Sequence, residues 1–196
     1  MKTKNFSIRK NFFSSLKFIK ECKNFIYISF SLFFLFSLIG FFIPIPEEIS
    51  SQLLELIKEL LKQTEDLSSL GLTQFIFLNN LQGSFFGMIF GAFFGIFPIL
   101  ALVFNGYLLG FVASISVREE GILILWRLLP HGIFELPAIF ISLGLGLKIS
   151  TFVLEKNKLK SFKDYLKKSI MVFLFVVIPL LIIAAIIEGS LIALSR

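Results

Sequence analysis

Long apolar stretches, separated by short polar segments, dominate the hydrophobic pattern of the chain. A helix needs about 20 consecutive apolar residues to cross the roughly 30 Å hydrocarbon core of a bilayer, and every stretch is near that length or longer. The pattern therefore predicts an all-α fold, an integral membrane bundle of five transmembrane helices. The predicted spans are residues 25–43, 73–97, 99–117, 121–147 and 170–187.

Residues 47–66 interrupt this pattern with an amphipathic repeat. Ile49, Leu53 and Leu56 recur every three or four residues, and six acidic residues against two lysines occupy other positions. Apolar residues at this spacing form one face of a helix. We expect an external amphipathic helix, which either lies on the outer leaflet and caps the bundle or docks a partner protein.

The first 23 residues are polar and basic, yet Phe12, Phe13, Leu16 and Ile19 follow a helical spacing. One interpretation is a helix in the cytoplasmic interface, held against anionic lipid. The other is a solvated basic tail. In both cases residues 1–23 form a segment separate from the membrane domain, residues 24–196.

Basic residues are concentrated in two places. Fourteen of the 19 lie in residues 1–23 and 148–168, and cytoplasmic segments next to membrane spans carry an excess of Lys and Arg. A turn at Phe97-Pro98 brings both segments to the same side, with 148–168 as a cytoplasmic loop. The charge pattern therefore predicts a multi-pass protein of the cell membrane, with its amino terminus in the cytoplasm and its carboxyl terminus outside.

Composition narrows the class of protein. The chain is 56% hydrophobic and 16% charged, whereas a soluble domain has about a quarter charged residues. The net charge of +6 alone would fit a nucleic-acid partner, but the charges flank the spans, so no nucleic acid is expected. The expected partners are the lipid bilayer and other membrane or envelope proteins. The single cysteine, Cys22, excludes an internal disulfide, and either palmitoylation or an unmodified thiol is compatible with its position.

Ionisable and amide side chains lie inside the predicted spans, where they are costly unless they face protein or water. Helical rise places them in two layers, one near the outer face and one near the inner face. We expect a polar seam between spans two, three and four, with the second-span asparagines at the level of Arg127 and Asn105 at the level of Glu135. The seam residues are Asn79, Asn80, Asn105, Arg127, His131 and Glu135.

Three roles for this seam remain open: mutual satisfaction of polar groups, a path for a small polar substrate, ion or proton, and catalysis. Arg127, His131 and Glu135 are spaced by four and share one helix face. A catalytic or metal site is the least favoured, because a metal normally needs three or four ligands and the chain has one histidine and one cysteine. We expect no catalytic residue, no metal and no cofactor.

Four glycines, Gly83, Gly87, Gly91 and Gly95, are spaced four apart along the second span. Small residues on one helix face allow two helices to approach closely in lipid. We expect a helix-packing face, whose partner is either another helix of the same chain or a second copy in a homo-oligomer.

Three strings carry a resemblance to a known family: 78–80 (Leu-Asn-Asn), 104–110 (Phe-Asn-Gly-Tyr-Leu-Leu-Gly) and above all 130–138 (Pro-His-Gly-Ile-Phe-Glu-Leu-Pro-Ala). Together with the glycine-rich second span, they make residues 77–146 similar to the stage II sporulation protein M family. The resemblance implies a five-span integral membrane protein of the cell envelope. It assigns no biochemical role to the histidine and glutamate of the third string.

The resemblance also implies a type of function. In spore formers, the named member of the family holds together membrane-anchored peptidoglycan hydrolases during engulfment and is not itself a hydrolase. The expected function is therefore a non-enzymatic scaffold or assembly factor of the cell envelope. The alternative is a small transporter, or a transporter membrane subunit, that uses the polar seam.

Overall fold

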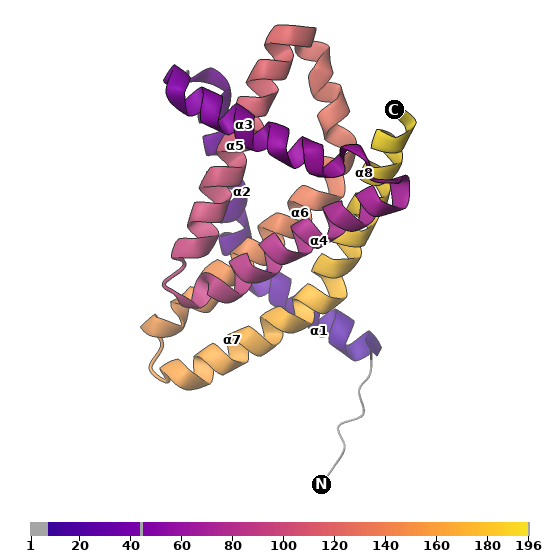
Figure 1. Cartoon of the computed structure of the whole chain (residues 1–196). Helices are drawn as coiled ribbons and strands as arrows, with labels where there is room; N and C mark the ends of the chain where they lie inside the picture. The colour runs from indigo at the N-terminus through magenta and orange to yellow at the C-terminus, as the bar shows by residue number, and fades with distance from the viewer. Residues whose placement is uncertain (1–7, 44, 196) are drawn as a thin grey trace.

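The computed structural model describes the backbone of residues 8–43 and 45–195, and their side chains except at 60, 61, 65, 126–131 and 192–195. Within these residues every regular element is helical, which confirms the all-α prediction (Figure 1). The α-helices are α1 Ile8–Glu21, α2 Lys23–Phe42, α3 Glu47–Glu65, α4 Ser69–Ile89, α5 Ile96–Glu120, α6 Leu125–Ser150, α7 Lys158–Val172 and α8 Ile178–Ser195. Short 3-10 turns at Phe90–Ala92, Ile122–Ile124 and Thr151–Leu154, and a π-helical turn at Phe173–Val177, complete the set.

Five helical segments of the described chain are long and apolar enough to cross a membrane, as the hydrophobic pattern predicts. By length and composition, the chain is a multi-pass membrane protein. The five segments are Lys23–Phe42, Ser69–Ala92, Ile96–Glu120, Gly132–Leu154 and Lys158–Leu191.

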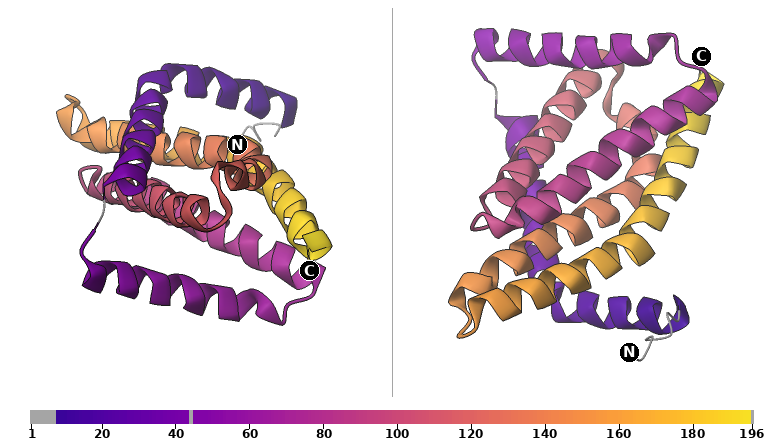
Figure 2. Two further views of the ribbon diagram at one scale, coloured as in Figure 1. Left: turned by 90° about the horizontal axis from the view of Figure 1, so that it is seen from above. Right: turned by 60° about the horizontal axis from the view of Figure 1, so that its bottom comes forward.

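The charged segments separate to the two ends of the bundle. Figure 2 shows α3 and the C-terminal end of α8 at one end and α1 at the other, and α7 contacts α1. The two basic segments of the sequence thus lie at one end and the acidic helix α3 at the opposite end. This arrangement agrees with the positive-inside pattern, and the assignment of the basic end to the cytoplasm stays a prediction.

The turn between α4 and α5 lies earlier than Phe97-Pro98, where it was predicted. The chain turns at residues 93–95, where Phe94 and Gly95 have positive φ angles of 55° and 73°. Pro98 is instead buried in the first turn of α5. Proline is tolerated there because the first N–H groups of a helix have no partner within the helix.

The segment 148–168 was predicted to be a loop, and the structure corrects this. The end of α6, the 3-10 turn Thr151–Leu154 and α7 occupy most of it. Helix α7 then continues through the π-helical turn into α8, so the last span is the second part of one long helix. The physical reason is an apolar face within the lysine-rich sequence: Phe162 and Leu166 pack against the buried cluster that contains Phe18 of α1.

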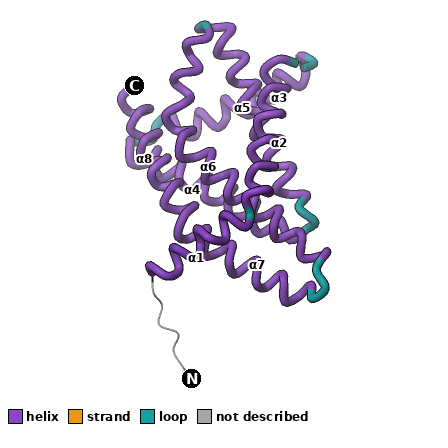
Figure 3. The backbone as a smooth tube through the Cα atoms, turned by 180° about the vertical axis from the view of Figure 1, so that it is seen from behind, coloured by secondary structure: helices purple, strands orange, loops and turns teal. Residues whose placement is uncertain are grey.

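Helix α6 is the centre of the bundle. It contacts α2, α4, α5, α7 and α8, and Figure 3 shows it between α4 and α8 on one side and α2 and α5 on the other. Both buried clusters contain α6 residues. One includes Leu145 and Ile149 with residues of α1, α4 and the α7–α8 helix, and the other includes Phe140 and Leu143 with residues of α2 and α5.

Candidate functional site

The candidate site is built around a change of direction in α6. Figure 1 shows the first part of this helix descending from the loop after α5 and then turning into the bundle. Pro130 and Pro137 lie in this first part. Because a proline lacks the N–H that a helix interior uses and clashes with the preceding turn, it bends a helix. The bend carries the first part of α6 away from α2 and α5.

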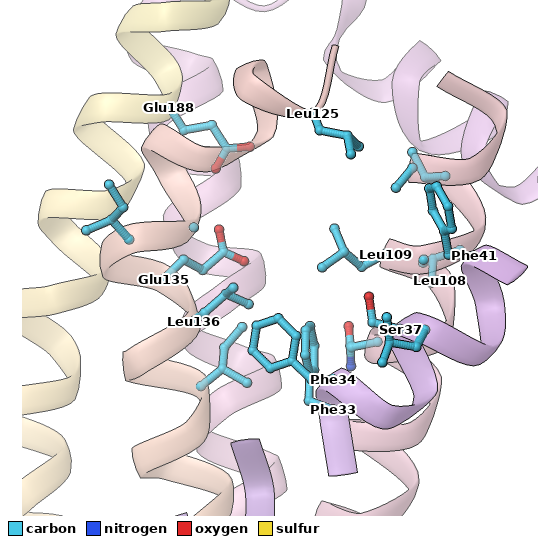
Figure 4. A pocket seen from close by; sticks show the side chains of 18 residues that line it. Phe33, Phe34, Ser37, Phe41, Leu108, Leu109, Leu125, Glu135, Leu136 and Glu188 are labelled. Atoms are coloured by element: carbon cyan, nitrogen blue, oxygen red, sulfur yellow. The ribbon is translucent and has the colours of Figure 1, made fainter. Parts of the chain in front are cut away.

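A cavity of about 700 Å³ lies between α2, α5 and the first part of α6, with α8 at its edge (Figure 4). Its walls are mainly aromatic and aliphatic, from residues such as Phe33, Leu109 and Leu136. The polar side chains among the lining residues are Ser37, Asn105, Glu135 and Glu188. The cavity is therefore apolar in bulk, with a small number of hydrogen-bonding groups.

Two carboxyl groups lie on one wall of this cavity. Figure 4 shows the side chains of Glu135, from α6, and Glu188, from α8, on the same side of the opening. The two groups are close enough to interact electrostatically, and the Asn80 side chain of α4 lies close to the Glu135 carboxyl. Side chains from three helices thus form one polar cluster, which can bind a hydrogen-bond donor or a cation.

The structure brings together some of the predicted seam residues but not all. Asn80 was expected at the level of Arg127 and instead lies beside Glu135. Asn80 was assigned to that level by counting along straight helices, with the second span beginning at residue 73. In the structure α4 begins at Ser69 and α6 bends, so the levels differ. Asn79 is exposed on α4.

Asn105 lines the cavity from α5, whereas Glu135 lines it from α6. Its amide donates a hydrogen bond of 2.7 Å to the carbonyl oxygen of Ala101, one turn earlier in the same helix. Its side-chain oxygen is a further hydrogen-bond acceptor. The predicted side-chain positions of Arg127 and His131 lie outside the described residues.

Glu188 is a site residue that the sequence analysis missed. The fifth span was predicted to end at residue 187, which left Glu188 outside the membrane. The apolar sequence resumes with Leu191, Ile192 and Ala193, and this resumption was the available signal. A single carboxylate inside a continuing apolar helix indicates a position that faces protein.

The predicted glycine face divides into three environments. Gly87 and Gly91 face α6, where an added Cβ would meet the side chain of Leu143 and the backbone of Gly146 respectively. Gly83 has no atom within 4 Å of such a Cβ, and Gly95 is the turn residue with φ of 73°. The close packing is therefore within the chain, between α6 and the segment formed by α4 and its following 3-10 turn. A homo-oligomer that packs through all four glycines stays a prediction, and this packing does not support it.

A second glycine contact joins α2 to α5. A Cβ added at Gly106 or Gly110 would meet the backbone carbonyl of Phe33 or Ser37, and one at Gly40 would meet that of Tyr107. Gly106 and Gly110 are spaced by four, so the sequence contained this signal. The partner Gly40 could not be identified without knowing which helices are neighbours.

No three His, Cys, Asp or Glu side chains of the described residues gather as a metal-binding group. The side chains that line the cavity supply oxygen atoms and no sulfur or imidazole among the described positions. The arrangement supports binding through hydrogen bonds and apolar contact.

Comparison with known proteins confirms the resemblance found in the sequence. Residues 29–191 match the family model described as stage II sporulation protein M. An uncharacterized protein of Methanocaldococcus jannaschii is 37% identical over 123 residues, which cover 58% of this chain and 66% of that protein. No solved structure matches the chain.

Proposed function

Because the chain belongs to the stage II sporulation protein M family, we propose that it is a non-enzymatic scaffold or assembly factor in the membrane of the cell envelope. The observation that carries this proposal is the position of α3. Figure 2 shows α3 lying across one end of the bundle, and its contacts with the other described helices are sparse. A helix tethered at both ends and weakly packed in between is available to a partner.

The surface of α3 is suited to an interaction with another envelope protein. Ile49 and Leu56 of its apolar face are exposed, at 49% and 41%. Glu47 and Glu48 lie in its first turn, where negative charge complements the positive end of the helix dipole. A partner protein can bury the apolar stripe, and the acidic residues beside the stripe can orient the partner through its positive charges.

The experiment changes only this face. The double variant Ile49→Glu and Leu56→Glu should abolish complementation of a strain that lacks the gene, while the detergent-resolved thermal stability of the protein is unchanged. The matched control is Ser51→Glu with Gln63→Glu, which adds the same charge at other exposed positions of α3. Equal growth of both strains would remove α3 as the functional surface and contradict the scaffold proposal.

The cavity favours a second candidate function, a small transporter or a transporter membrane subunit. Intramembrane carboxyl groups such as Glu135 commonly mark paths for protons or ions. Glu135→Gln separates the two candidates, because it keeps the shape and most of the hydrogen-bonding capacity and removes the charge. A scaffold should tolerate this change, and a transporter should lose function while the protein still folds.

The control for that test is Glu135→Leu, which puts an apolar side chain beside the polar groups of Asn80 and Glu188 and should lower thermal stability. A folded but inactive Glu135→Gln variant would replace the scaffold proposal with the transporter.

A further inference from the structure

We propose that the cavity between α2, α5, α6 and α8 binds a membrane amphiphile with one long apolar chain and a hydrogen-bond-donating head group, an amine or a hydroxyl. This ligand goes beyond the scaffold function, which requires no small molecule. Three properties of the cavity support the proposal: its size and lining, its opening, and the acceptors on its walls.

The size and the lining fit a hydrocarbon chain. The volume of about 700 Å³ lies within the range of roughly 300–1,000 Å³ typical of small-molecule sites. The apolar wall includes Phe33, Phe34, Leu109, Leu136 and Ile139. Apolar walls offer water few hydrogen bonds, so a cavity of this kind favours an apolar occupant over water.

The cavity opens at the surface of the bundle. Phe34, Leu38 and Ile133 line it and yet are 38%, 56% and 62% exposed. All three belong to segments that are long and apolar enough to span the membrane. The surroundings of the opening are therefore lipid, and a molecule already dissolved in the bilayer reaches the cavity by lateral diffusion.

The polar groups on the walls select the head group. Asn105 of α5 and Glu135 of α6 both line the cavity and carry side-chain oxygens that accept hydrogen bonds, and the wall with Glu135 also carries Glu188. A head group that donates hydrogen bonds can pair with the side-chain oxygens of Asn105 and Glu135. A carboxylate head group is disfavoured, because like charges repel strongly where the dielectric constant is low.

The test uses three photoactivatable, alkyne-tagged probes with the same long chain: an amine, an alcohol and a carboxylic acid. Each is added to the full-length protein in nanodiscs, cross-linked by light and mapped by peptide mass spectrometry. We expect the amine and the alcohol to label peptides with residues 33–41 and 132–139 saturably, at least about fivefold more than the acid. An excess of untagged amine should suppress this labelling.

Two variants link the labelling to the cavity. Ala113→Phe places a bulky group in the lining and should remove most of the labelling, and Val112→Phe serves if the first variant does not fold. The matched control is Ile183→Phe on α8, an exposed position outside the lining, which should label as the unmodified protein does. Glu135→Gln should weaken amine labelling severalfold and affect the alcohol less, because only the amine gains from the charge.

Three outcomes would overturn the proposal: equal labelling by all three probes, labelling that does not saturate and spreads over other exposed faces such as Leu174, or unchanged labelling in a folded cavity-filling variant. None of these outcomes depends on whether α3 binds a partner.

Discussion

The two parts of α6 differ in how closely the bundle packs around them. In the second part, Ala138, Leu145 and Ile149 have no exposed surface. In the first part, residues 132–137 are half-buried or exposed, and Ile133 is 62% exposed. Gly132, Ile133, Glu135 and Leu136 among them line the cavity. The same helix therefore has a tightly packed part near the basic end of the bundle and an open part near α3.

Small residues account for the difference. In the second part, Gly144 and Gly146 let the backbones of α2 and α4 approach α6, and the buried Ser142 hydroxyl donates a 2.7 Å hydrogen bond to the carbonyl oxygen of Ser84. The first part has two prolines, which bend a helix. A Cβ added at Gly132, the glycine of this part, would meet only the side chain of Leu136 in the same helix. In lipid, where hydrophobicity does not drive helices together, close packing depends on such small residues. Apolar residues alone therefore do not bring the helices of this bundle into close contact.

The largest effect is expected where the packed part of α6 meets the 3-10 turn that follows α4. Gly91→Leu would force a side chain into the backbone of Gly146, which cannot move aside as a flexible side chain can. Overpacking typically costs about 1–3 kcal/mol, and we expect at least the upper limit or loss of the folded protein. The measurement is accumulation in the membrane together with thermal stability in detergent.

Gly83→Leu is the matched control, because nothing lies within 4 Å of its added Cβ. It should accumulate as the unmodified protein does. If both variants behaved alike, the four glycines would share one environment and the packed part would lose its physical explanation.

Truncation of a leucine should separate the two parts of α6 directly. Leu145→Ala removes a fully buried side chain and should destabilise the protein by about 2–4 kcal/mol. Leu136→Ala enlarges a cavity that already exists and should cost less than about 1 kcal/mol, because its side chain has fewer packing partners to lose. Detergent-resolved unfolding measures both, and equal costs would show that the cavity is closed in solution.

A smaller effect is expected at the hydrogen bond between α6 and α4. Ser142→Ala removes the donor to the Ser84 carbonyl oxygen and should cost about 0.5–1.5 kcal/mol, in line with hydrogen bonds between membrane helices. Ser51→Ala, which removes an exposed hydrogen bond within α3, is the control and should stay within about 0.5 kcal/mol. If Ser142→Ala lowered the stability no more than Ser51→Ala, the close contact between the two backbones, and not this hydrogen bond, would hold α4 and α6 together.

The fold could be predicted from the sequence to a large extent, because lipid requires long apolar helices and these leave a strong pattern. The five apolar stretches and the amphipathic 47–66 segment all correspond to helices. The sequence did not predict the details that depend on local backbone geometry, such as the position of the turn between α4 and α5. Pro98 suggested a turn, but proline is equally suited to a first helical turn, and the actual turn at Gly95 depends on its positive φ angle.

The candidate site could be predicted only in part. Glu135 was identified because a carboxylate inside an apolar run is costly. Its contact with Asn80 depends on helix tilt and on the bend of α6, and neither follows from counting residues along straight helices. Glu188 was missed because the predicted span ended at residue 187, whereas α8 continues to Ser195. The cavity arises from the packing of four helices and has no signature in any one segment.

The smallest effect is expected at Cys22, which lies in the same buried cluster as Leu145 and Ile149 and has no exposed surface. Burial raises the pKa of its thiol from 9.0 to about 12, and the nearby Lys148 opposes this only in part. Since the thiolate is the reactive form, its fraction at pH 8 is roughly a thousandfold lower than for an exposed cysteine. Of the two states that the sequence left open, burial favours the unmodified thiol.

We therefore expect almost no alkylation of Cys22 by a maleimide at pH 8 in the folded protein, and full alkylation after denaturation. The control is Ser51→Cys combined with Cys22→Ser, which puts the one thiol on the exposed face of α3 and should react within minutes. Rapid reaction of native Cys22 would show that the cluster beside the second part of α6 opens readily. A thiol held inside a closed cluster stays protonated and inaccessible to the reagent. Rapid reaction would therefore mean that the second part of α6 is no more firmly packed than the first part.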